Sequence, residues 1–266
     1  MELIRSRRNP IVSRFRAAAG GAGDAVVLEG ARLIADALDA GVALEAAAVV
    51  DPDAADLRMP GLVARLTAAG PTVRVTPPVM QALSPAASPS GVVALGRVAT
   101  ATLDRVTAGA RPLVIALLGV QDPGNTGAVI RAAEAGGATG VVVVGGADPF
   151  GWKAVRGAMG SAFRLPIARL ADPEPVRRTA GARGLRVLAA APQGGAAITE
   201  TDLRPPTLVW LGAEGDGLAA GVLGAADGIV SVPMRAPVES LNIAVAGALI
   251  VYEAARQRAT LDREDP

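Results

Sequence analysis

The sequence contains no cysteine and no histidine among its 266 residues, and aromatic residues make up 2% of it. Without thiols or imidazoles, the chain cannot form disulfides, Cys or His metal sites, a Cys nucleophile, or a triad that uses a His base. Three Phe, two Trp and one Tyr also argue against an extended base-stacking platform. The chemistry must therefore use carboxylates, hydroxyls, amides, guanidinium groups and backbone dipoles, and we expect no metal.

Long hydrophobic runs are missing as well, although the mean hydropathy is +0.39. The longest runs, 113–120 and 243–252, fall well short of the roughly 20 residues that a membrane-spanning helix needs. No apolar segment of the signal-peptide type follows the basic N-terminus, because residues 17–19 lead directly into the glycine-rich stretch 20–23. These features predict a cytoplasmic protein with no membrane partner.

Positive charge is concentrated at the N-terminus, where five Arg and a single acid, Glu2, lie within residues 1–16. This segment is either a solvated arm or a phosphate-contacting segment, and composition does not separate the two. Short apolar strands then alternate with helical patterns, which predicts a compact α/β domain over residues 1–99. Residues 100–111 are polar and lack apolar periodicity, so we expect a linker there.

A second domain is predicted over residues 112–266. Its strongly apolar strands are expected at 113–118, 141–144, 186–190, 207–211 and 229–232. Continuous apolar strands separated by helices indicate an α/β fold with a parallel sheet covered on both faces. A last helix is predicted to follow, with Ser240 as its N-cap and an apolar stripe that packs against the sheet or a second copy of the chain. The stripe consists of Leu241, Ala244, Val245, Ala248, Leu249 and Tyr252.

Ligands of an open parallel sheet bind beyond the carboxyl ends of the strands, so the loops there are the first place to look for a site. Read singly, each loop is a tight turn in which Asn125, Thr126 or Ser240 caps a helix. Read together, three loops place on one rim a set of polar residues that turn chemistry does not require: Asn125, Arg131, Glu214, Ser240 and Asn242. The glycine-rich loop 212–217 has the spacing GxxGxG and two acids, which disfavours a nucleotide-phosphate enzyme.

Three segments carry a family resemblance: LGVQDPGNTGAVIRAAEAGG, LVWLGAEGDGL and VSVPMRAPVESLNIAVAGALIVYEAAR. They resemble, in order and spacing, the successive motifs of the SpoU (TrmH-like) branch of the SPOUT RNA methyltransferases, and the resemblance extends over residues 113–256. It implies a deep C-terminal trefoil knot that forms a pocket for S-adenosyl-L-methionine (AdoMet), a homodimer, and methylation of a ribose 2′-hydroxyl in rRNA or tRNA. The N-terminal block, with NPIVSRFR, LEGARLIADAL and SPSGVVAL, resembles the RNA substrate-binding domain that precedes the catalytic domain in many members.

The resemblance also implies roles for individual residues. Arg131 would reach the RNA phosphate or the target hydroxyl, and Glu214 matches the acid of the second motif. The remaining matches are Asn125 in the first motif, Ser240 and Asn242 in the third, and Gly212, Val232 and Leu241 in the methyl-donor pocket. Because a guanidinium stays protonated, we expect Arg131 to orient the ribose-phosphate and to stabilise alkoxide charge rather than act as a base.

Some alternatives remain open from the sequence. Glu214 is either catalytic or a structural carboxylate that holds the loops. Ala158 and Ala244 stand where many relatives carry Ser, which affects details of substrate contact and not the reaction class. The competing function is a non-catalytic RNA-binding protein on the same scaffold, and an unrelated α/β enzyme would need a phosphate-binding loop that is not found.

Overall fold

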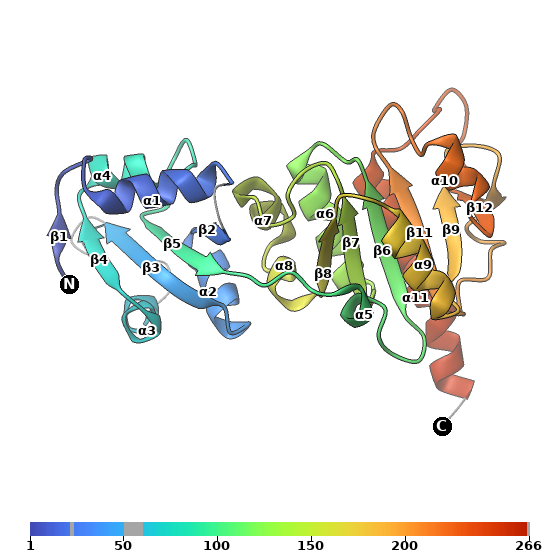
Figure 1. Cartoon of the computed structure of the whole chain (residues 1–266), viewed down its shortest axis with the longest axis horizontal. Helices are drawn as coiled ribbons and strands as arrows, with labels where there is room; N and C mark the ends of the chain where they lie inside the picture. Colours follow the sequence, from blue (N-terminus) through green and yellow to red (C-terminus); the bar gives the residue numbers. More distant parts are fainter. Residues whose placement is uncertain (22–23, 51–60, 265–266) are drawn as a thin grey trace. The chain divides into compact units, whose positions relative to one another are not determined.

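The computed structural model describes residues 1–21, 24–50 and 61–264. The chain forms two compact units, each with its own sheet (Figure 1). Unit 1 consists of Met1–Ala99 and Phe150–Phe163, and unit 2 consists of Thr100–Pro149 and Arg164–Pro266.

This division differs from the predicted domains, 1–99 and 112–266, at two places; both predicted ranges also include residues outside the described part. The expected linker, 100–111, belongs to unit 2 and contains the one-turn helix α5 (Leu103–Val106), whose Val106 is fully buried. Such a short helix has no room for an apolar period. The second difference is the segment 150–163, which packs with unit 1.

Unit 1 is built on a five-stranded mixed sheet of order β1-β4-β3-β5-β2. Strand β4 is parallel to β1 and β3, whereas β5 is antiparallel to β3 and β2. The strands are β1 (Leu3–Ile4), β2 (Ala25–Glu29), β3 (Ala43–Val50), β4 (Thr72–Val75) and β5 (Val92–Arg97). The helices are α1 (Pro10–Ala19), α2 (Ala31–Asp39), α3 (Leu62–Ala69), α4 (Pro77–Leu83) and α7 (Trp152–Ala158).

Two helical layers cover the sheet of unit 1. Phe15 of α1 and Met80 of α4 pack into one cluster with inward-facing residues of the strands, and Trp152 of α7 packs against the same cluster. Helices α2 and α3 lie on the opposite face, where Ile34 and Leu66 are fully buried (Figure 1). The sheet of unit 1 is therefore covered by α1, α4 and α7 on one side and by α2 and α3 on the other.

Unit 2 contains a seven-stranded sheet of order β10-β12-β9-β11-β6-β7-β8, in which every pairing is parallel. The strands are β6 (Leu113–Leu118), β7 (Gly140–Val144), β8 (Ile167–Leu170), β9 (Arg186–Ala190), β10 (Ala196–Ala197), β11 (Thr207–Gly212) and β12 (Gly228–Ser231). The other helices of unit 2 are α6 (Pro123–Ala135), α9 (Glu174–Ala182), α10 (Ala220–Gly224) and α11 (Ile243–Glu264), and α8 (Ser161–Arg164) spans the boundary between the two units. The predicted parallel α/β sheet is confirmed, and β8 and β10 are additions to it.

Both faces of this sheet are covered by helices. Val106 of α5 and Val176 of α9 pack in one cluster with Val142 and Trp210 of the strands, and Val222 of α10 packs against it. Helices α6 and α11 pack against each other on the opposite face, and α11 also contacts β11 (Figure 1). A Cβ added to Gly247 of α11 would stand 2.9 Å from Leu211 Cδ1, so the missing side chain allows the helix to approach β11 closely.

Helix α11 corrects the predicted N-cap and, for the predicted apolar stripe, the alternative of packing against the sheet. It begins at Ile243, and Asn242 caps it by accepting a hydrogen bond from the backbone N–H of Ala244 at 2.9 Å, so Ser240 is not the N-cap. Three large members of the predicted stripe point to solvent and not to the sheet: Val245, Leu249 and Tyr252 are 49%, 42% and 54% exposed. The side that packs within the unit is formed by Ile243, Gly247, Ile250, Val251 and Ala254. Neither α11 nor any other helix in the described ranges is long and apolar enough to cross a membrane.

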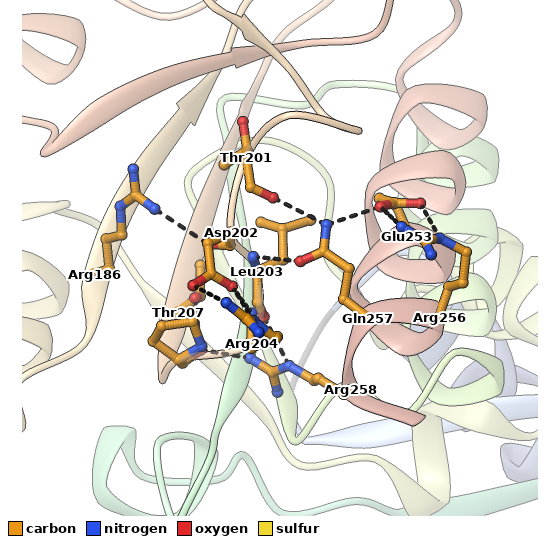
Figure 2. A network of polar contacts seen from close by, with 11 residues as sticks. Arg186, Thr201, Asp202, Leu203, Arg204, Thr207, Glu253, Arg256, Gln257 and Arg258 are labelled. Atoms are coloured by element: carbon orange, nitrogen blue, oxygen red, sulfur yellow. Dashed lines mark hydrogen bonds and ion pairs between the residues drawn. The ribbon is translucent and has the colours of Figure 1, made fainter. Parts of the chain in front are cut away.

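The C-terminal half of α11 is tied to the chain that enters β6 and β11. Figure 2 shows Gln257 and Arg258 pointing toward the segment that leads into β11. Gln257 Oε1 accepts from the N–H of Leu203 at 2.8 Å. The guanidinium of Arg258 donates to the carbonyls of Leu203, Pro205 and Arg111 at 2.9, 2.7 and 2.8 Å. Because these carbonyls precede strands, the guanidinium satisfies backbone acceptors that the sheet leaves unpaired.

Candidate active site

The carboxyl ends of β6, β11, β12 and β9 lie at one edge of the sheet in unit 2. Leu118, the last residue of β6, is in register with Gly212, the last residue of β11. Ala190, which ends β9, is in register with Val230 near the end of β12. Because the strands are parallel, the loops that follow them start side by side at this edge.

Three polar side chains from these loops form a closed hydrogen-bonded triangle. Asn125 Nδ2 donates to Glu214 Oε1 at 2.8 Å. Asn242 Nδ2 donates to the same carboxylate oxygen at 2.8 Å and to Asn125 Oδ1 at 3.0 Å. The triangle therefore joins the loops that follow β6, β11 and β12, which are far apart in the sequence.

The first corner of the triangle is positioned by the start of α6. The carboxylate of Asp122 accepts a hydrogen bond from the backbone N–H of Asn125 at 2.7 Å, and Pro123 occupies the first helical turn. Asp122 is therefore the N-cap, and neither Asn125 nor Thr126 is needed for that role. This arrangement leaves the Asn125 amide to bind Glu214.

The second corner depends on a close backbone approach at Gly212. A Cβ at this position would meet the backbone of Gly217, and it would stand 2.6 Å from the N–H nitrogen of Leu218. The loop folds back on Gly212 because Ala213 and Gly217 form an antiparallel bridge. Glycine is therefore required at 212 for the loop that carries Glu214 to close.

A cavity of about 380 Å³ opens beside the triangle. Leu211, Val230 and Ile250 contribute apolar side chains to its lining, and Glu214 and Asn242 contribute polar ones. The three residues that the resemblance assigned to the methyl-donor pocket, Gly212, Val232 and Leu241, all line the cavity. Ser240 lines it as well. A largely apolar cleft with a few convergent polar groups is the usual form of a small-molecule site.

Asn125 does not line the cavity itself and reaches its rim through the bonds to Glu214 and Asn242, whereas the predicted site residue that joins neither the cavity lining nor the triangle is Arg131. It is exposed on α6, it is absent from the cavity lining, and it makes no hydrogen bond or ion pair with another described residue. Sequence reasoning missed Ala190, the last residue of β9, and the two residues after it, Ala191 and Pro192, all of which line the cavity. The rule that ligands bind at the carboxyl ends of strands also covers this loop, but Ala190, Ala191 and Pro192 themselves carry no polar side chain that would single them out.

The fold and the site define the class of the protein: a parallel α/β sheet with a nucleoside-sized, mostly apolar cavity at its carboxyl edge. Within the described part of the chain, no group of three or more His, Cys, Asp or Glu residues could hold a metal ion. The model of the SpoU rRNA Methylase family matches residues 112–252, which is more than half of the chain. The chain belongs to this family.

Individual relatives agree with this assignment. The chain is 35% identical over 184 residues to an uncharacterized tRNA/rRNA methyltransferase of Synechocystis. This match covers 68% of this chain and 65% of the relative. It is 40% identical over 140 residues to the 23S rRNA guanosine 2′-O-methyltransferase RlmP of Bacillus subtilis, over 52% of this chain and 56% of RlmP. The AdoMet-bound rRNA methyltransferase of Sinorhizobium meliloti superposes with a TM-score of 0.84 at 29% identity, over 96% of this chain and 97% of that one. The chain spans between about half and two thirds of the length of the curated relatives it matches.

Proposed function

We propose that this chain uses AdoMet to methylate a ribose 2′-hydroxyl in an rRNA or a tRNA. The observation that carries the proposal is the meeting of Asn125, Glu214 and Asn242 beside an apolar cavity. The similarity to RlmP, a 2′-O-methyltransferase, supports the 2′-oxygen as the target, and the AdoMet-bound Sinorhizobium structure supports AdoMet as the methyl donor.

The residues of the cavity fit AdoMet. A volume of about 380 Å³ lies within the range of roughly 300–1,000 Å³ that holds ligands of this size. No Lys or Arg is among the described residues that line the cavity, so it suits an adenosine better than a nucleotide phosphate. Gly212, Val232 and Leu241 would hold the donor through backbone groups and apolar contact. When bound, AdoMet supplies a methyl group that its sulfonium activates for transfer.

The triangle supports a positioning role for Glu214. Its Oε1 accepts both amide N–H groups, from Asn125 and Asn242, at 2.8 Å. A carboxylate that accepts two hydrogen bonds fixes the loops that carry the donors, which keeps the cavity rim in one arrangement. Ser240, which also lines the cavity, would contribute a hydroxyl to the rim.

Arg131 supplies a positive charge that no carboxylate in the described ranges of the chain neutralises. A guanidinium keeps its proton in proteins, so it cannot remove the proton of the 2′-hydroxyl. Arg131 would bind the ribose-phosphate of the target nucleotide and stabilise the developing alkoxide, and alignment with the donor supplies much of the acceleration.

The assembly and topology implied by the family resemblance belong to the same proposal. We infer a homodimer in which a second copy covers Val245, Leu249 and Tyr252, because these apolar side chains form one exposed face of α11. We infer that residues 1–99 serve as the RNA substrate-binding domain. We also infer a deep C-terminal trefoil knot, and the match of the SpoU family model to residues 112–252 supports it.

The experiment combines calorimetric titration of AdoMet with a methyl-transfer assay on total RNA from a strain that lacks the gene, followed by mapping of methylated riboses. We expect the wild-type chain to bind AdoMet and to methylate a ribose. Arg131→Ala is expected to keep AdoMet affinity and to lose most of the transfer rate. The matched control is Arg178→Ala, which removes an exposed arginine of α9 and should leave both the affinity and the rate unchanged.

Each component of the proposal can fail separately. An absence of AdoMet binding by the wild-type chain would favour the non-catalytic RNA-binding protein. Full turnover by Arg131→Ala would remove the role assigned to that guanidinium and leave the reaction class intact. Methylation of a base in place of a ribose would overturn the assignment of the 2′-hydroxyl.

A further inference from the structure

The two helical layers of unit 1 differ in charge. Helices α2 and α3 contain two Arg and two Asp, which pair as Arg32 with Asp36 at 3.5 Å and Arg65 with Asp39 at 2.6 Å. Helices α1, α4 and α7 contain no acidic residue. Their charged residues are Arg14, Arg16, Lys153 and Arg156. One layer is therefore neutral and self-paired, and the other is uniformly positive.

Helix α7 presents its cations outward. Val155 and Ala158 are fully buried, while Lys153 and Arg156 are exposed on the opposite side of the helix. Trp152 anchors α7 to the core of unit 1, and Lys153 Nζ lies 5.7 Å from the centre of its ring. Neither Lys153 nor Arg156 makes an ion pair with a carboxylate in the described ranges. The burial pattern thus fixes which side of α7 carries charge to solvent.

Two cations, one in α1 and one in the segment before it, are held in place by backbone carbonyls and not by a carboxylate, and a third shares a single acid with another arginine. Arg7 Nε donates to the carbonyl of Pro78 at 3.0 Å, and Arg16 Nε donates to that of Ala82 at 3.3 Å. Arg14 reaches Glu45 at 3.5 Å, but the same carboxylate accepts from Arg97 Nε at 3.0 Å. Carbonyl partners orient a guanidinium and leave its full charge, so this layer is ready for an anion.

We propose that this basic helix layer, formed by α1, α4 and α7 with Arg7, Arg14, Arg16, Lys153 and Arg156, binds the phosphate backbone of the substrate RNA. The inference rests on the proposed function, because it takes RNA as the substrate. It adds α7, a segment from within the family-matched range 112–252, to the surface that grips the RNA. Phosphate contacts by arginines give affinity and register without reading sequence, which suits a chain with few aromatic side chains.

The test compares two double variants that remove the same charge from unit 1. Lys153→Gln with Arg156→Gln changes the basic helix layer, and Arg32→Gln with Arg65→Gln changes the opposite layer. The affinity of each full-length protein for a short mixed-sequence RNA hairpin is measured by fluorescence anisotropy between about 50 and 200 mM salt. AdoMet affinity and circular dichroism are measured on the same samples to verify the fold.

We expect the α7 double variant to bind RNA about ten-fold more weakly and to lose about 1.4 from the slope of log K against log salt, with AdoMet affinity unchanged. Arg16→Gln should lower the slope independently by about 0.7. Wild-type slopes in the α7 double variant and in Arg16→Gln, or an equal loss in the α2–α3 control, would overturn this surface. A wild-type chain that binds AdoMet but no RNA at any salt would overturn the proposed RNA substrate itself, and with it this inference.

Discussion

Replacing Glu214 by Gln and by Ala should have different consequences, because its Oε1 accepts two hydrogen bonds at 2.8 Å from Asn125 and Asn242. Gln keeps an acceptor oxygen of the same shape and loses only the charge assistance. Ala removes both bonds. At an exposed site each bond to a carboxylate is worth about 1 kcal/mol, so Ala costs about 2 kcal/mol and Gln about half of that.

These energies convert into AdoMet affinity if the triangle holds the cavity rim. About 2 kcal/mol corresponds to roughly thirty-fold weaker binding for Glu214→Ala, against about five-fold for Glu214→Gln. Isothermal titration calorimetry measures the affinities, and single-turnover methyl transfer at saturating AdoMet measures the chemical step. The matched control is Asp216→Asn, which removes an exposed acid from the same loop and should leave both quantities near the wild-type values.

A different pattern would refute the positioning role. If Gln and Ala at 214 slowed the single-turnover rate equally and both left AdoMet affinity unchanged, the negative charge itself would act in the reaction. The Gln variant distinguishes the two roles, because it preserves the hydrogen-bond acceptor while it removes the negative charge.

Three further changes probe the loop, the long helix and the assembly. Gly212→Ala should abolish AdoMet binding in calorimetry, because its Cβ would collide with the backbone of the returning loop, whereas Gly221→Ala in α10 has open space around it and should bind normally. The pKa of Glu253 is lowered to about 2 by Arg256 and a neighbouring amide, so its ionised form stabilises the fold fully above pH 4.5 and this stability is lost as the pH falls through 2. Because Arg256 is exposed and water screens the pair, urea unfolding should show Glu253→Gln less stable than wild type by about 1 kcal/mol at pH 6 and by progressively less in acid, and a pH-independent difference would contradict the assignment. Leu249→Arg should convert a dimer into a monomer in analytical ultracentrifugation, and an unchanged sedimentation coefficient would place the dimer contact elsewhere.

The sheet of unit 2 was predictable because its strands are continuous apolar runs, which only a sheet buried on both faces requires. The side of α11 that faces the sheet was not predictable in the same way. Both sides of the helix are apolar, and the choice depends on the absence of a side chain at Gly247, which lets the backbone approach Leu211. Periodicity measures how apolar a face is and not how closely it can approach a neighbour.

The triangle was predictable from topology alone. Parallel strands end at a common edge, so polar residues close to the strand ends gather there whatever the length of chain between them, whereas Arg131, further along α6, does not join them. The capping residues were not predictable from the sequence. Asp122 is as good a cap for α6 as Asn125, and Asn242 is as good a cap for α11 as Ser240, so only the observed helix starts decide between them. The assignment of α7 to unit 1 also escaped the sequence, since it depends on where Trp152 finds a core.

Helix α11 connects these features. Asn242 at its start belongs to the triangle, and Gln257 and Arg258 in its second half bind the segments that enter β11 and β6. The rise of an α-helix places these two regions about 22 Å apart, so the helix is fastened near both edges of the sheet. Ile250, between them, lines the cavity. A rigid element held at both ends cannot slide along its axis without breaking hydrogen bonds at one of them, which gives the cavity wall a defined position before any ligand arrives.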